Sequence, residues 1–117
     1  MVSDSIIAEF ENAIENPEEY GSGEARNKLR AAFDLMSSQV CRSILGNEPL
    51  SRMNARQMLN GCKQEDFPAD QWNVIARLRE AIRASETTIH AKDYSDHTDD
   101  ISFFISKHLK GLYEVLV

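Results

Sequence analysis

The chain lacks the sequence features that most directly identify enzymes and membrane proteins. Its 117 residues contain no glycine-rich phosphate-binding loop, no metalloprotease HExxH helix and no nucleophile elbow. No apolar run approaches the roughly 18 residues needed to span a membrane. The N-terminus has no basic region followed by an apolar one, so we expect no signal peptide. These absences favour a cytoplasmic protein with no membrane partner.

Cysteine, proline and glycine are scarce. Cys41 and Cys62 have no second cysteine or histidine at metal-ligand spacing, which argues against a disulfide framework and a zinc site. Cys41 lies beside an apolar stripe and is expected to be a small buried side chain. The acidic segment 93–100 has the composition of a calcium loop but lacks the central glycine and the final glutamate. We therefore predict no metal and no cofactor.

The net charge of −6 is distributed unevenly along the chain. Residues 1–25 carry seven acidic and no basic side chains, whereas residues 26–63 carry seven basic and two acidic ones, a net of +5. Two interpretations remain open. A polarised domain could present a basic face to phosphate, or the acidic first helix could pack beside the basic second helix and pair with it.

Hydrophobic periodicity predicts an all-α fold, an antiparallel bundle of four or five helices with short loops. The expected helices start at Ser3 or Asp4, at Ser22 or Gly23, at residue 51, at 68–70, and at Thr98 or Asp99. No segment alternates apolar and polar residues for long enough to be a strand. The chain is expected to form one domain, 1–117, with an acidic N-terminal helix and turn at 1–20. Trp72 is expected to anchor the core, and Met36, Met53 and Met58 to fill gaps in it.

A polar stripe near the end of the fourth expected helix is the main candidate for chemistry. Arg83 and His90 are seven positions apart, nearly two helical turns, so they share a face if the helix persists. Arg79 and Glu86 fall on the same stripe. The β-branched run at 87–89 predicts that the helix weakens there, with His90 at or just past its end.

An arginine and a histidine together can cleave RNA without a metal. The arginine neutralises phosphate charge and the histidine transfers protons. The alternative is structural: Arg83 pairs with Glu80 or Glu86 on a solvated face, and His90 caps the helix C-terminus, where a protonated histidine is favoured by the helix dipole.

The run RASETTIH at 83–90, followed by a polar segment and a last amphipathic helix, resembles the HEPN superfamily of small α-helical domains. The resemblance implies a HEPN-like core that covers residues 24–117. The resemblance implies a metal-independent ribonuclease in which Arg83 binds phosphate and His90 transfers protons. It also implies a homodimer in which both motifs line one cleft. The chain departs from many active members at Ala84, where a polar residue is common. Glu86 would place a negative charge beside the phosphate.

Two functional classes follow. The first is a HEPN-like ribonuclease of a toxin–antitoxin or phage-defence system, with RNA as substrate and an antitoxin or target as protein partner. The second is a non-catalytic interaction module such as an immunity, inhibitor or adaptor protein. A second apolar edge on the last helix, at Phe103, Tyr113 and Val115, is a candidate partner surface. The two classes differ in His90, which the enzyme requires to be exposed beside Arg83.

Overall fold

The computed structural model describes residues 1–21, 23–91 and 98–117, and the fold is all-α. Its α-helices are α1 (Asp4–Glu15), α2 (Gly23–Val40), α3 (Arg52–Asn60), α4 (Ala69–Ser85), α5 (Thr98–Phe104) and α6 (Lys110–Leu116). One π-helical segment, Cys41–Leu45, extends α2, and another, Ile105–Leu109, joins α5 to α6. The described residues therefore form five continuous helices and no strand, which confirms the predicted fold class.

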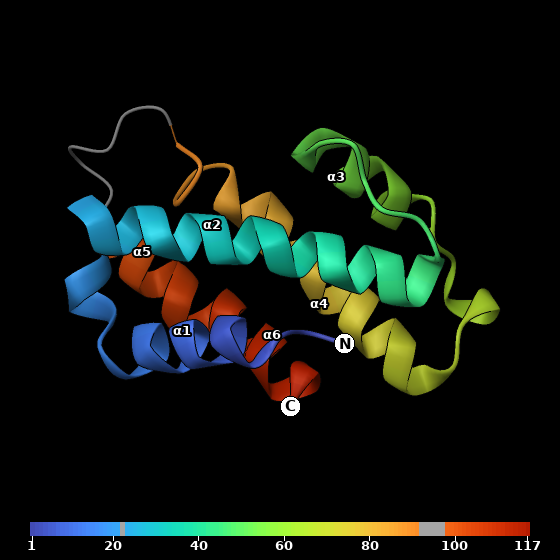
Figure 1. Ribbon diagram of the computed structural model, residues 1–117, viewed down its shortest axis with the longest axis horizontal. Helices are drawn as coiled ribbons and strands as arrows, with labels where there is room; N and C mark the ends of the chain where they lie inside the picture. The colour runs from blue at the N-terminus through green and yellow to red at the C-terminus, as the bar shows by residue number, and fades with distance from the viewer. Residues whose placement is uncertain (22, 92–97) are drawn as a thin grey trace.

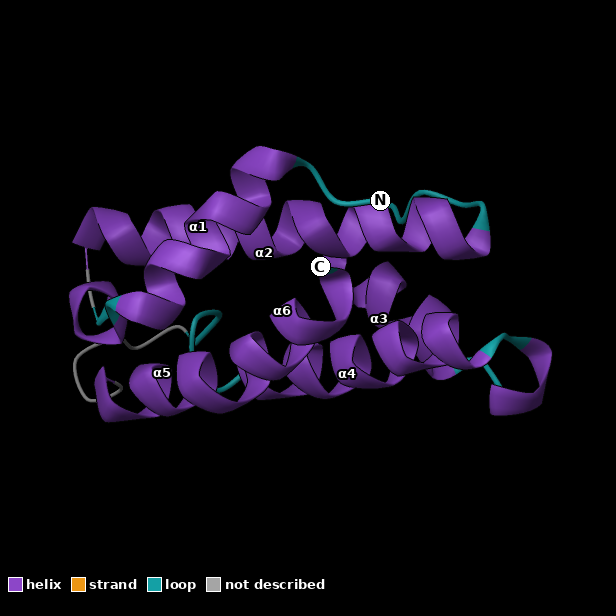
Figure 2. Ribbon diagram, turned by 90° about the horizontal axis from the view of Figure 1, so that it is seen from below, coloured by secondary structure: helices purple, strands orange, loops and turns teal. Residues whose placement is uncertain are grey.

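The helices form two layers. In Figure 1, α2 runs along the length of the molecule, with α1 beside it and α4 and α5 behind. The turned view in Figure 2 places α1 and α2 in one layer and α4, α5 and α6 in the other. The whole measures 40 × 26 × 20 Å. Helix α3 lies near the C-terminal end of α2 and packs against α4 (Figure 1).

Local signals in the sequence set the helix ends. Helix α1 stops just before Pro17, and Gly46 ends the α2 extension in a left-handed conformation with φ of 76°. Ser51 caps α3, because its hydroxyl oxygen accepts a hydrogen bond from the Asn54 N–H at 3.1 Å. Helix α4 ends at Ser85, immediately before the region in which the β-branched run predicted weakening.

One apolar core includes side chains from all five continuous helices. Residues 1–20 are part of it, since Ile6, Phe10 and Tyr20 are buried together with the interior faces of α2 and α4. Cys41 is fully buried, as predicted. The expectation for Met53 was wrong: it is 68% exposed, whereas Ala55 and Leu59 are the buried residues of α3 and Met58 packs partly buried against the core.

The acidic first helix packs beside α2, but charge pairing does not join the two. Among the described residues, no acidic side chain of α1 forms an ion pair with a basic side chain of α2. The contact is made instead by apolar residues such as Ile6 and Leu29. No helix in the described ranges is long and apolar enough to cross a membrane.

Candidate functional site: an arginine groove and a buried histidine

A groove with a volume of about 490 Å³ opens between α3 and α4. We call it the arginine groove, because Arg56, Arg79 and Arg83 contribute three cationic side chains to it. The full lining consists of Arg56, Leu59, Asn60, Ala76, Arg79, Glu80, Ile82 and Arg83. The groove therefore combines guanidinium groups with a few apolar atoms.

The two helices bring these arginines together through their buried faces. Arg79 and Arg83 are four residues apart on α4, so they lie one turn above each other. Arg56 comes from α3, which is held by its buried residues Ala55 and Leu59. The Arg79 guanidinium lies 6.0 Å from the centre of the Trp72 ring, which places the only tryptophan next to the groove.

Glu86 connects α3 to the end of α4. The Arg56 guanidinium donates a hydrogen bond from Nη1 to Glu86 Oε1 at 2.6 Å, with the two side chains 47% and 36% exposed. The sequence had suggested that Arg83 would pair with Glu80 or Glu86. Within the described ranges Arg83 has no ion pair, because Glu86 reaches across to α3.

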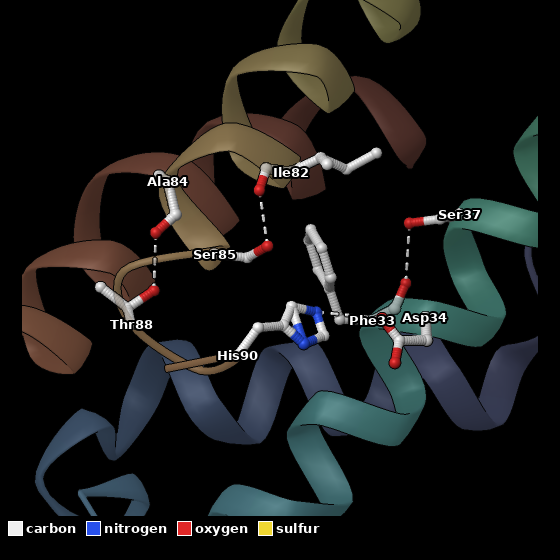
Figure 3. A network of polar contacts seen from close by, with 8 residues as sticks. All are labelled: Phe33, Asp34, Ser37, Ile82, Ala84, Ser85, Thr88 and His90. Atoms are coloured by element: carbon white, nitrogen blue, oxygen red, sulfur yellow. Dashed lines mark hydrogen bonds and ion pairs between the residues drawn. The ribbon is translucent and has the colours of Figure 1, made fainter. Parts of the chain in front are cut away.

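His90 lies in a different environment, in the turn that follows α4. Its side chain is 0% exposed and faces α2, as Figure 3 shows. The ring centre is 6.0 Å from that of Phe33, and Nε2 lies 3.0 Å from Asp34 Oδ1. That distance is within ion-pair range, but neither ring nitrogen makes a well-aligned hydrogen bond within the described part of the chain. The contact is therefore close without being a directed hydrogen bond.

Burial shifts the pKa values of both His90 and Asp34. Desolvation, with the positive charges of Arg52, Arg30 and Arg26 in support, lowers the pKa of His90 to about 4. Desolvation also raises the pKa of Asp34, although Arg52 and Arg30 oppose that change. A pKa of about 4 leaves the imidazole uncharged at neutral pH, so the 3.0 Å contact joins a neutral ring to Asp34.

The turn that carries His90 is fastened to its surroundings. Arg26 of α2 is only 2% exposed and donates from Nη2 to the Thr88 carbonyl at 2.7 Å. The Thr88 hydroxyl donates to the Ala84 carbonyl, and the His90 backbone N–H donates to the Ser85 carbonyl at 2.8 Å. The backbone of His90, and not its imidazole, thus satisfies the end of α4. The predicted side-chain cap is corrected accordingly.

The structure therefore divides the predicted site residues into two places. Arg79 and Arg83 line the groove, Glu86 reaches Arg56 beside it, and His90 is absent from the lining. Helix α4 ends at Ser85, so the shared face does not extend to His90.

Sequence reasoning missed Arg56 as a groove residue and Asp34 as the neighbour of His90. The net charge of +5 in residues 26–63 was the available signal for Arg56. No group of three or more potential metal ligands occurs among the residues searched, which are the described ones. Asp93, Asp96 and His97 lie outside the described residues.

The chain matches no protein-family model, no curated protein sequence and no solved structure. Fold and site together define an all-α helical bundle with an arginine-lined groove between two of its helices. The resemblance of residues 83–90 to the HEPN superfamily stays a prediction.

Proposed function

We propose that this chain is a non-catalytic helical binding module whose arginine groove binds an acidic segment of a partner protein. The observation that carries the proposal is the convergence of Arg56, Arg79 and Arg83 from two helices on one groove. Guanidinium groups bind carboxylates through charge-assisted, often paired hydrogen bonds. The role would be that of an adaptor, inhibitor or immunity protein. We place it in the cytoplasm, where its two free cysteines would stay reduced.

The burial of His90 favours binding over catalysis. A general acid or base must come within hydrogen-bond reach of the proton that it transfers. The His90 side chain has no exposed surface and lies outside the lining of the groove that contains Arg83. The alternative function, a HEPN-like ribonuclease, requires this imidazole to reach a phosphate, and an assay for RNA cleavage tests it.

An acidic protein segment suits the groove better than RNA does. The adjacent Trp72 ring is already stacked near Phe67 and Arg79, which leaves less of it for a base. A carboxylate already bound to Arg56 also matches the chemistry proposed for the partner.

The first experiment titrates the protein with a short poly-glutamate peptide and follows the fluorescence of Trp72. We expect saturable binding that weakens at high salt, because exposed charges are screened. Arg83→Gln should weaken binding by about tenfold. Arg42→Gln is the matched control, since Arg42 is exposed and lies outside the groove. Equal affinity in Arg83→Gln and Arg42→Gln would contradict the proposal.

The second experiment incubates the protein with RNA in EDTA, beside Arg83→Ala and His90→Ala. We expect no cleavage by any of the three. Cleavage by the unaltered protein that both substitutions abolish would instead establish the ribonuclease. An oligouridylate titrated under the conditions of the first experiment tests whether the groove prefers phosphate, and tighter binding of that RNA than of poly-glutamate would refute the choice of partner.

A further inference from the structure

We propose that Glu86, at the edge of the arginine groove, is a built-in competitor for Arg56, and that an acidic partner binds by displacing its carboxylate from Arg56. This inference rests on the proposed function and describes how the same site is regulated. The contact between Arg56 Nη1 and Glu86 Oε1, at 2.6 Å, has the geometry of the guanidinium–carboxylate bond that a partner would make. One arginine of the groove is therefore already bound to a carboxylate of this chain.

The Glu86 carboxylate lies at a position where it does not stabilise α4. It is the C-cap residue of that helix, with φ of −63° and ψ of −30°. A carboxylate there faces the negative end of the helix dipole, where a cation would be favoured. The placement is thus unfavourable for α4 alone, and the contact with Arg56 on α3 offsets it.

Displacement of Glu86 needs only a side-chain movement. The backbone around it is fixed, because the Glu86 N–H donates to the Arg83 carbonyl and the following turn is fastened through Thr88 to Arg26. The Glu86 and Arg56 side chains are both more than a third exposed, so solvent reaches the contact. An exposed pair of this kind is weak, so a carboxylate of a segment already bound in the groove can replace Glu86 at Arg56.

An internal carboxylate also selects for partners with several acidic residues. Because Glu86 is attached to the chain, it competes at an effective concentration on the order of millimolar. A lone carboxylate in solution gains one weak contact and cannot overcome that competition. A segment held by Arg79 and Arg83 presents its next carboxylate to Arg56 at a comparable effective concentration. The expected ligand is therefore a run of acidic residues.

The test compares Glu86→Gln with Glu80→Gln in the poly-glutamate titration. Both substitutions remove one negative charge at the groove, but only Glu86 bonds to Arg56 within the described ranges. We expect Glu86→Gln to tighten binding about two- to fivefold, the equivalent of an exposed ion pair. Glu80→Gln should change it less. In an Arg56→Gln background the additional gain from Glu86→Gln should vanish.

The possible results separate the two proposals. Equal gains in Glu80→Gln and Glu86→Gln, or a gain from Glu86→Gln that persists without Arg56, would overturn the displacement of Glu86 while leaving the groove as the binding site. Failure of every variant to bind poly-glutamate would overturn the proposed function and this inference together. Acetate serves as the single-carboxylate probe. If millimolar acetate displaced poly-glutamate from the groove, the requirement for several acidic residues would be contradicted. Thermal unfolding of each variant establishes that its fold is retained.

Discussion

The imidazole of His90 is enclosed by Phe33 and Asp34 of α2, and its chemistry follows from that enclosure. Desolvation penalises the charged ring, so its pKa falls to about 4 in the folded chain, against about 6.5 when exposed. Between these two values the unfolded state therefore binds more protons than the folded state, so the free energy of unfolding decreases as pH falls. The neutral, buried His90 makes its full contribution to stability above pH 6.5.

We expect the free energy of unfolding to decrease by roughly 3 kcal/mol from this group between about pH 6.5 and pH 4. Asp34 acts in the opposite direction, because its raised pKa lets the folded state take up a proton as pH falls. His90→Phe isolates the histidine, since it keeps a ring against Phe33 and does not titrate. Urea unfolding across this pH range should give a flatter profile for the variant than for the unaltered chain. Parallel profiles would refute the prediction.

Arg26 illustrates how a buried cation can be structural. Its Nη2 donates to the Thr88 carbonyl at 2.7 Å, which ties the turn after α4 to the start of α2. Arg26→Met keeps the apolar stem but leaves that carbonyl without this donor, and we expect a loss of roughly 2 kcal/mol. Urea unfolding at pH 7 measures it. Lys28→Met, on the exposed side of α2, should cost far less, and an equal cost would show that Arg26 has no special role.

At the scale of elements, the helices could be predicted because local chemistry determines where they begin and end. The β-branched run at 87–89 predicted the weakening beyond Ser85, and Gly46 ends the extension of α2 in a left-handed conformation. Met53 was misplaced because α3 is short, and periodicity in nine residues does not define a buried face well.

The contacts that define the candidate site could not be predicted in the same way. The pair formed by Arg56 and Glu86 joins residues 30 positions apart. The pair formed by His90 and Asp34 joins two different helix layers. Both depend on how α2, α3 and α4 pack, and helical periodicity contains no information on that packing. The sequence therefore identified Arg79 and Arg83 as candidates but not the partners that give the site its geometry.

Two glycines at helix ends, Gly46 and Gly61, test whether a left-handed backbone conformation requires glycine there. Gly46 has φ of 76°, and an added Cβ would meet nothing within 4 Å, so Gly46→Ala should cost about 1 kcal/mol through the backbone alone. Gly61 has φ of −78° and room for a Cβ, so Gly61→Ala should be neutral or stabilising by up to about 1 kcal/mol. Thermal unfolding of the two variants gives the comparison. Equal effects would contradict the role of the left-handed conformation.

At the scale of the whole molecule, the uneven charge does not divide the chain into separate units. The acidic residues 1–20 contribute Ile6, Phe10 and Tyr20 to the same core as α2, α4 and the C-terminal helices. The arginine groove lies between α3 and α4. Apolar packing thus joins parts of opposite charge, and the exposed charges remain available for partners.

This arrangement predicts that a chain beginning at residue 24 will not fold cooperatively. Ile6, Phe10 and Tyr20 each contribute about 1.5–3 kcal/mol by burial, a sum comparable to the whole stability of a domain this size. Removing them would also expose the apolar face of α2. Circular dichroism during heating should show a broad, shallow transition. The 117-residue chain with Asp4→Asn and Glu15→Gln lacks two of the six acidic charges of residues 1–23 but keeps the buried side chains, and it should unfold sharply. A sharp transition in the shortened chain would instead mean that residues 24–117 fold alone and that the first helix is an appendage to them.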